Sequence, residues 1–191
     1  MIRQLTSTPN LLTLMRLVFV PLIVLAVVGN HYSWALGIFI VAGITDGLDG
    51  LLARLMKQQT QLGQYLDPIA DKLLLSTMFL VLSFMHRIPW GVTVLVFSRD
   101  IIIVIICTLL YITGAMKSFP PSFFGKANTA AQIVTVPLVL ANEIIPHVRW
   151  IETARHLFFN IVVILTVVSG VHYLWRVAMA LRHTGSRATP A

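Results

Sequence analysis

The sequence predicts an all-α integral membrane protein, a bundle of six transmembrane helices. Two observations on composition point there. Hydrophobic residues make up 57% of the 191 residues and charged residues only 11%, against roughly 25% charged residues in an average soluble domain. The mean hydropathy is +0.85. A soluble domain of this size has too little interior for so much apolar side chain. A soluble enzyme, a disordered chain and a nucleic-acid-binding module are therefore excluded as first hypotheses.

The third observation is the length of the apolar stretches, since about 20 apolar residues cross a hydrocarbon core about 30 Å thick. Six stretches are long enough or nearly so, and none alternates as a strand would. We expect spans at 11–28, 33–56, 63–85, 90–114, 124–141 and 154–181, within a single membrane domain of residues 1–191.

Boundary signals separate these spans in order along the chain. Pro9 and Asn10 break the chain and cap the first span. A cleaved signal peptide is the alternative for that span, but Arg16 interrupts its apolar run and five further spans follow. The connections between successive spans are short and lie at 29–32, 57–62, 86–89, 115–123 and 142–153.

Six spans place both termini on one side of the membrane, and positive charge indicates which side. Lys and Arg gather in the cytoplasmic segments of membrane proteins. With cytoplasmic termini, the inner segments hold Arg3, Arg54, Lys57, Lys117, Lys126, Arg176, Arg182 and Arg187, and the outer ones only Arg87, Arg149 and Arg155. We therefore expect a multi-pass protein with residues 57–62 in the cytoplasm, and its net charge of +7 needs no nucleic-acid partner.

Four of the five aspartates lie inside predicted spans, close to that cytoplasmic connection. Asp46 and Asp49 are three residues apart on the second span, and Asp67 and Asp71 are four apart on the third, so each pair shares a helix face. Measured from a turn near Thr60, Asp49 and Asp67 differ in depth by only about 6 Å. Carboxylates inside a membrane are costly and indicate function. All four can converge in one pocket that opens to the cytoplasmic side.

Four carboxylates in one pocket cannot all stay ionised without countercharge, and Arg54 and Lys72 supply only two nearby cations. A hard divalent cation resolves this shortfall. An all-oxygen ligand set favours Mg²⁺ or Mn²⁺, with two ions of the kind that clamp a phosphoryl group. Proton or sodium transport, and ion pairs that merely hold helices together, are the alternatives. A transporter would usually show an internal repeat, and the sequence has none.

Small residues surround the carboxylates. Gly50 and Gly63 favour a pocket, because a bulky ligand can then lie against the helix backbone. Gly43 and Gly47 have the small-xxx-small spacing, which suits close helix packing and ligand access equally well.

The complete pattern resembles the signature of the CDP-alcohol phosphotransferases. The run Asp46-x-x-Asp49-Gly50-x-x-Ala53-Arg54 is followed, after eight residues, by Gly63-x-x-x-Asp67-x-x-x-Asp71. The resemblance extends from Pro9-Asn10-Leu11-Leu12-Thr13 and Arg16 to Gly125-Lys126-x-x-Thr129-Ala130 and covers about residues 5–135. The last span resembles the family only in being apolar.

The resemblance implies transfer of a phosphate-bearing group from a CDP-linked donor to an alcohol, with release of CMP. It implies that the four aspartates hold the metal, and that Asp71 also takes the proton of the attacking hydroxyl as a general base. It implies a cytidine diphosphate pocket lined by Gly50, Ala53, Arg54 and Gly63. The expected partners are CDP-diacylglycerol, phosphatidylglycerol or glycerol 3-phosphate, membrane lipids and a second copy of the chain in a homodimer.

Two cations beyond the signature are expected to bind the acceptor, Arg99 and Lys126. Positive charge in or near an apolar stretch calls for an anionic complement, and arginine suits a phosphate. A pair with Asp100 is the alternative for Arg99, although consecutive helix residues point about 100° apart.

The choice of acceptor depends on few positions. Enzymes that use glycerol 3-phosphate typically carry Glu, Arg and Lys where this chain has Asp100, Cys107 and Asn128. A phosphomonoester carries nearly two negative charges and a phosphodiester one, so fewer cations favour the diester. We therefore expect phosphatidylglycerol as acceptor, as in cardiolipin synthases, with glycerol 3-phosphate, as in phosphatidylglycerophosphate synthases, as the alternative.

Overall fold

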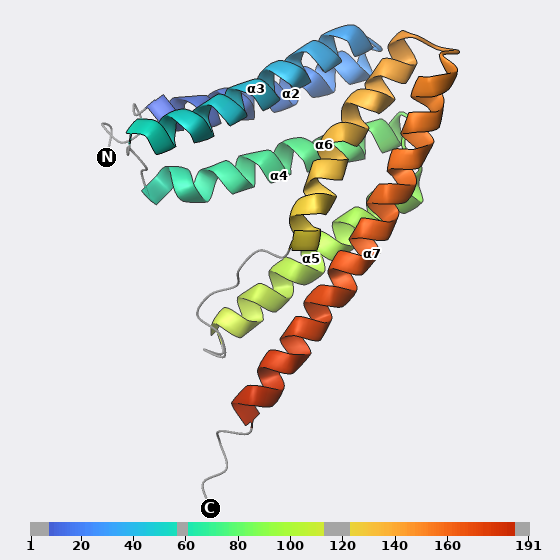
Figure 1. Ribbon diagram of the computed structural model, residues 1–191. Coiled ribbons are helices and arrows are strands. Elements are labelled where there is room, and N and C mark those ends of the chain that lie inside the picture. Colours follow the sequence, from blue (N-terminus) through green and yellow to red (C-terminus); the bar gives the residue numbers. More distant parts are fainter. Residues whose placement is uncertain (1–7, 57–60, 113–122, 186–191) are drawn as a thin grey trace, which may run out of the picture. The chain divides into compact units, whose positions relative to one another are not determined.

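The computed structural model describes the backbone of residues 8–56, 61–112 and 123–185, and side chains over 15, 17–45, 47, 72–106, 108 and 123–179. This part of the chain is helical with short turns and contains no strand (Figure 1). Its helices are α2 (Thr8–Val28), α3 (Tyr32–Met56), α4 (Gln61–Phe84), α5 (Trp90–Ile112), α6 (Phe123–Ile144) and α7 (Arg149–Gly185). The predicted all-α fold class is confirmed for the described residues.

The helix boundaries lie within about five residues of the predicted spans, and the starts of α7 and α2 differ most in what they imply. Helix α7 begins at Arg149, so the end of the predicted connection 142–153 is helical. Helix α2 begins at Thr8, which puts Pro9 and Asn10 inside its first turn. The predicted cap at Asn10 is therefore wrong, and the proline is tolerated there because first-turn N–H groups have no helical partner. Most of the predicted connections 57–62 and 115–123 lies outside the described residues.

One described segment is both long and apolar enough to cross a membrane. It is Arg149–Met179 in α7, with a mean hydropathy of 2.1 over its most apolar window, of which 22% is buried. Three shorter apolar segments belong to α2, α3 and α4, at Leu17–Val28, Tyr32–Thr45 and Lys72–Phe84. Six helices are thus present in the described residues, while six membrane spans stay a prediction.

The chain divides into two compact units. Unit 1 comprises Met1–Ile88 and Val136–Thr153, and unit 2 comprises Pro89–Thr135 and Ala154–Ala191. In unit 1, α2 packs against both α3 and α4. Its described buried side chains are apolar apart from Ser83, and include Ile23, Phe39 and Phe79.

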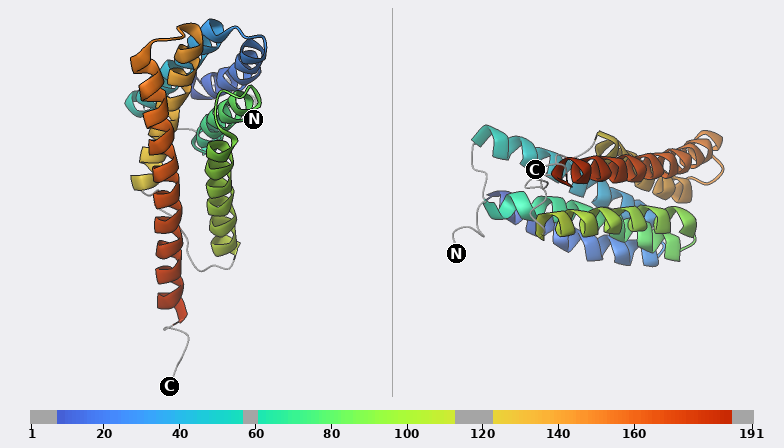
Figure 2. Two further views of the ribbon diagram at one scale, coloured as in Figure 1. Left: turned by 90° about the vertical axis from the view of Figure 1, so that its right-hand side faces the viewer. Right: turned by 90° about the horizontal axis from the view of Figure 1, so that it is seen from below.

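Unit 2 has a different interior. Val92, Val96 and Val162 supply buried apolar side chains, and α5, α6 and α7 also bury hydroxyl and amide groups. These polar residues are Thr93, Asn128, Gln132, Thr135, Thr166 and Ser169. Helix α7, 37 residues long, continues unbroken in both views of Figure 2.

A polar clamp holds turns of unit 1 together. Arg87, in the turn after α4, forms an ion pair of 2.8 Å with Glu143 near the end of α6. The same guanidinium lies over the ring of Tyr32 at the start of α3, 5.6 Å from its centroid. The Tyr32 hydroxyl donates a hydrogen bond of 2.9 Å to Asn30. The clamp therefore ties the α2–α3 turn, the turn after α4 and the end of α6.

Candidate active site

The four aspartates of the signature lie on two helices of unit 1, at matching depths. Helix α3 ends just before residues 57–60, and α4 begins just after them. The two helices are therefore antiparallel (Figure 1). Asp49 and Asp67 lie seven and six residues from those helix ends, and Asp46 and Asp71 ten residues each. At 1.5 Å per residue, the inner pair differs in depth by about 1.5 Å and the outer pair by about zero. This difference is smaller than the predicted 6 Å because the residues are counted from the two helix ends instead of from Thr60.

The side chains of this region lie mostly outside the described ones. They include the four aspartates and the predicted cytidine diphosphate contacts Gly50, Ala53, Arg54 and Gly63, as well as Arg16 in α2. The direction in which they point stays a prediction. Gly43 and Gly47, however, are described, and a Cβ placed on either meets no atom within 4 Å. No described atom therefore packs closely against these glycines, and ligand access to them stays a prediction.

The donor set on α3 and α4 fits a divalent metal. It offers only carboxylate oxygens, the ligands that Mg²⁺ and Mn²⁺ prefer. Each of the two depths carries one aspartate from α3 and one from α4. Among the described side chains, no group of three His, Cys, Asp or Glu could hold a metal elsewhere. The four aspartates therefore stay our predicted metal ligands, on the chemistry of their carboxylates.

Arg99 lies on α5 in unit 2, and two neighbours hold its guanidinium. Nη1 donates to Oδ1 of Asp100 at 2.8 Å, and Nη2 donates to the hydroxyl of Ser169 on α7 at 2.5 Å. The side chains of the ion pair are 12% and 14% exposed. We expected consecutive helix residues to point too far apart for an Arg99–Asp100 pair, and this expectation is wrong. The long arginine stem carries its charged tip away from the direction of its Cβ. The charge of Arg99 thus has a complement inside unit 2, and a role in acceptor binding stays a prediction.

The other residues of the acceptor argument differ in their surroundings. Lys126 lies in the first turn of α6 and its side chain is exposed. Asn128, two residues on, is fully buried and accepts a hydrogen bond of 3.1 Å from the Thr166 hydroxyl of α7. An amide at position 128 therefore has a packing role that does not depend on the charge of the acceptor. The side chain of Cys107 lies outside the described ones.

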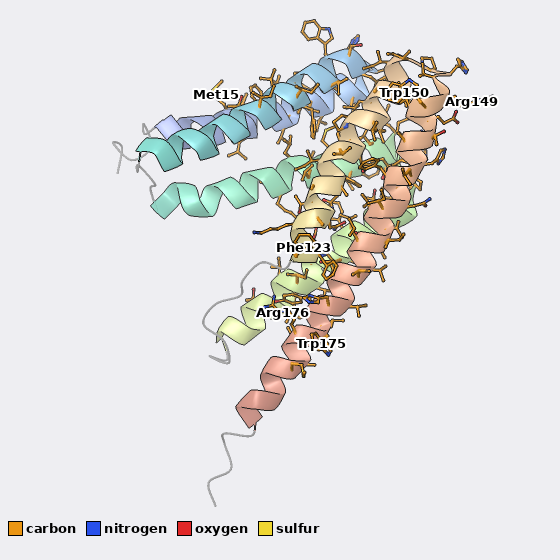
Figure 3. All side chains as sticks on the ribbon, viewed as in Figure 1. Met15, Phe123, Arg149, Trp150, Trp175 and Arg176 are labelled. Atoms are coloured by element: carbon orange, nitrogen blue, oxygen red, sulfur yellow. The ribbon has the colours of Figure 1, made fainter. Side chains whose placement is uncertain are left out.

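Sequence analysis missed Thr166 and Ser169, the hydroxyl groups through which α7 binds α6 and α5. Their signal is the spacing of three residues, which puts both on one face of an otherwise apolar helix. Figure 3 shows the side chains along α7, with Trp150 near its beginning and Trp175 and Arg176 toward its end. Helix α7 is thus more than an apolar span.

Comparison with known proteins places this arrangement in a family. The sequence model of the CDP-alcohol phosphatidyltransferases matches residues 6–181. The chain belongs to this family. The match includes nearly all of α7 and so extends well beyond the resemblance predicted for residues 5–135. It confirms a phosphatidyltransferase over an ion transporter or a purely structural membrane protein.

Two relatives cover most of this chain at 36% identity. A protein of Mycobacterium tuberculosis named probable phosphatidylglycerophosphate synthase aligns over 190 residues, 95% of this chain and 85% of its own length. A protein of Escherichia coli K12 named CDP-diacylglycerol–glycerol-3-phosphate 3-phosphatidyltransferase aligns over 175 residues, 88% of this chain and 93% of its own length. Both names indicate glycerol 3-phosphate chemistry, and neither indicates the phosphatidylglycerol acceptor that our sequence analysis favoured.

The family assigns the chain to phospholipid biosynthesis as a transferase. Divalent metals are general in this family, in agreement with the donor set on α3 and α4. The family consists of membrane proteins, which agrees with the apolar segment of α7.

Proposed function

We propose that this enzyme transfers the phosphatidyl group of CDP-diacylglycerol to the hydroxyl of glycerol 3-phosphate and releases CMP. The observation that carries the proposal is the signature on α3 and α4, at matched depths, in a chain whose relatives of 36% identity are named for this acceptor. Because the family match runs through both compact units, we take residues 6–181 as one functional domain.

The carboxylates of unit 1 perform the chemistry in this proposal. Asp46, Asp49, Asp67 and Asp71 would hold two divalent cations, Mg²⁺ or Mn²⁺, which would offset the charge of the diphosphate and make CMP a better leaving group. Asp71 also acts as the general base. It accepts the proton of the acceptor hydroxyl while the hydroxyl oxygen bonds to the phosphatidyl phosphorus. The bond from that phosphorus to the CMP oxygen breaks, and CMP carries the electron pair away.

The donor lies against the small residues of the signature. Gly50 and Gly63 leave room for the diphosphate beside the helix backbones. Ala53 lines the same face of α3, and Arg54 pairs with a phosphate oxygen, for which its planar fork is suited. The open space at Gly47, beside Asp46, supports access of a bulky ligand to this stretch of α3.

Phosphatidylglycerol is the second candidate acceptor. Asn128 is a buried neutral amide, and Arg99 is already paired with Asp100, so unit 2 offers little uncompensated positive charge for a phosphomonoester. A phosphodiester carries one negative charge and needs less. This acceptor would make the enzyme a cardiolipin synthase.

A single assay separates the two acceptors. Purified enzyme receives CDP-diacylglycerol and Mg²⁺ or Mn²⁺, with either glycerol 3-phosphate or phosphatidylglycerol, and the lipid products are identified by mass spectrometry. We expect phosphatidylglycerophosphate and an equal amount of CMP from the first mixture. Cardiolipin from the second mixture alone would replace the first candidate by the second. The absence of CMP release in both would overturn the proposal.

We also propose that the connection after α3 faces the cytoplasm, on the count of positive charges in the sequence. Gln59, in that connection, lies outside the described residues and gives the test. In a Cys107→Ala background, a cysteine at position 59 should react with an impermeant thiol reagent only after the membrane is opened. Labelling of intact cells would refute the orientation.

A further inference from the structure

Aromatic rings gather in unit 2 where α6 begins and α7 nears its end. Phe124, in the first turn of α6, meets the ring of His172 on α7 edge to face, with 5.2 Å between the ring centroids. The ring of His172 lies 6.3 Å from that of Trp175, and the ring of Phe123 lies 6.1 Å from that of Phe124. These four residues form a continuous group, which we call the aromatic cluster.

The two outer rings of the aromatic cluster are exposed. Phe123 is 79% exposed and Trp175 is 59% exposed, whereas Phe124 and His172 are partly buried. Figure 3 shows Phe123 at the start of α6, and Trp175 and Arg176 toward the end of α7. An exposed ring beside an apolar helix suits a membrane surface, where its body meets lipid and an indole N–H meets the polar layer.

The position of the cluster along α7 agrees with such a surface. The segment that is long and apolar enough to cross a membrane ends at Met179, four residues after Trp175 and three after Arg176. Helix α7 continues to Gly185, about 9 Å further along its axis. In a membrane, Trp175 and Arg176 would therefore lie where the helix leaves the hydrocarbon core and enters the headgroup layer.

Positive charge accompanies the exposed rings. Arg176 is exposed and follows Trp175 directly. Arg182 and His183 come seven residues after this pair, so their positions fall on the same face of α7. Residues 153–191 contain no Asp and no Glu. The last turns of α7 therefore carry basic residues that no acidic residue of this stretch offsets.

The exposed groups select the chemistry of a partner. Phe123 and Trp175 offer apolar surface to acyl chains, and the indole N–H can donate to an ester carbonyl. The planar fork of Arg176 suits a phosphate. Net positive charge favours a headgroup of net negative charge over a zwitterionic one, which carries a cation of its own. An anionic phospholipid meets all these conditions.

The other end of α7 has a similar pair in different surroundings. Arg149 and Trp150 are adjacent and both exposed, as Trp175 and Arg176 are. Glu152, however, lies three residues after Arg149 in the first turn, and this spacing lets opposite charges offset each other. The two ends of one helix therefore give a site and its matched control.

We propose that Phe123, Trp175 and Arg176 form a binding site for the headgroup region of an anionic phospholipid. The two rings contact the ester region and the upper acyl chains, and Arg176 pairs with the phosphate. Arg182 and His183 add positive charge on the same face of α7. This inference goes beyond the proposed function and does not depend on it, since the lipid is bound here and is not a substrate.

The test follows the fluorescence of one tryptophan at a time. Trp34→Phe, Trp90→Phe and Trp150→Phe together leave Trp175 as the single tryptophan of the chain, and a second protein carries Trp175→Phe instead of Trp150→Phe. Each is reconstituted in phosphatidylcholine vesicles with rising fractions of brominated phosphatidylserine or brominated phosphatidylcholine, whose bromine atoms quench a nearby indole. Phosphatidylserine is anionic, but it is neither the donor nor an acceptor in the proposed reaction.

Brominated phosphatidylserine should quench Trp175 at a mole fraction about 5-fold lower than brominated phosphatidylcholine, the contribution of one basic residue near an anionic surface. Arg176→Gln should remove most of this preference, and about 0.5 M salt should weaken it by screening. Circular dichroism checks that each variant is folded. In the protein that keeps Trp150, both lipids should quench nearly equally, with or without Arg149→Gln.

Equal quenching of Trp175 by the two lipids would overturn the inference, and so would a preference that Arg176→Gln leaves intact. An equal preference at Trp150 would also overturn it, because any helix end in an anionic bilayer would then behave alike. If the single-tryptophan proteins do not fold, spin-labelled phosphatidylserine and phosphatidylcholine are compared on the chain with all its tryptophans. Arg176→Gln should then lower the ratio of bound phosphatidylserine to phosphatidylcholine, and Arg149→Gln should not. Neither measurement needs turnover, so CMP release tests the proposed function separately.

Discussion

The two units treat polar groups inside apolar helices in opposite ways. Of the buried polar residues with described side chains, Ser83 belongs to unit 1 and the other six to unit 2. Unit 2 satisfies much of this polarity within itself, through the Arg99–Asp100 ion pair and the Asn128–Thr166 hydrogen bond. Unit 1 carries four aspartates within 26 residues, with two cations nearby in the sequence.

This difference between the units indicates where chemistry and where recognition should lie. A cluster with excess negative charge needs a ligand of opposite charge, so changes there should remove activity outright. A region that neutralises its own charge binds a ligand through hydrogen bonds, and changes there should weaken affinity without abolishing turnover.

The largest effect is expected for the carboxylates. Asp46→Asn, Asp67→Asn or Asp71→Asn should each lower turnover by at least about 100-fold, because a charged metal ligand or the base is lost. Thr45→Val is the neighbouring control, since its hydroxyl donates to the carbonyl of Val41 on the same helix at 2.7 Å and should be dispensable. CMP release from CDP-diacylglycerol is the measurement. Near-normal turnover in any of the three aspartate variants would remove unit 1 as the site of chemistry.

Removal of the metal should abolish the activity that we assign to unit 1 and should lower the melting temperature of the protein. A chelator should abolish CMP release, and excess Mg²⁺ or Mn²⁺ should restore it. A ligand present at about 100 times its Kd stabilises a folded protein by about 2.7 kcal/mol, so the melting temperature should fall with chelation. A variant with all four aspartates changed to asparagine should show no such fall. Full activity in the chelator would contradict the metal site.

Arg99 tests whether unit 2 contributes to binding. Arg99→Ala should raise the acceptor KM roughly 10- to 150-fold, the loss of a charge-assisted hydrogen bond of about 1.5–3 kcal/mol, and should also lower stability, since α5 loses its bond to α7. Arg99→Lys should recover only part, because the fork is lost. Ser169→Ala, which removes one of the two partners, should cost less than either. Equal defects for donor and acceptor would mean that Arg99 only joins the two helices.

The smallest effect is expected for the clamp of unit 1, away from the aspartates in the sequence. Arg87→Ala should lower the free energy of unfolding by about 1 kcal/mol, the sum of a half-exposed ion pair and a cation–π contact. Turnover and both KM values should stay at the wild-type level. A double-mutant cycle with Glu143→Gln measures the ion pair alone. A loss of turnover in Arg87→Ala would show that the clamp also shapes the active site.

The helices could be predicted because each follows a long apolar run, but their ends obey other rules. Helix α7 starts at Arg149, before the apolar run, because helix formation continues through charged residues such as Glu152, which suits a first turn. The positions of the aspartates follow from spacing on single helices. The partner of Arg99 does not, since Ser169 is 70 residues away and only packing brings the two together.

Helix α7 is longer than a bilayer is thick, and two of its exposed tryptophans are separated by about one bilayer thickness. Trp150 and Trp175 are 70% and 59% exposed and lie 25 residues apart, about 38 Å, close to the 40–45 Å between the two headgroup layers. In a thinner bilayer such a helix tilts to keep both rings at the interfaces. Thr166 and Ser169 would tilt with it, and with them the side chains of Asn128 and Arg99. If Arg99 binds the acceptor as predicted, we expect acceptor affinity to depend on the acyl-chain length of the surrounding lipid.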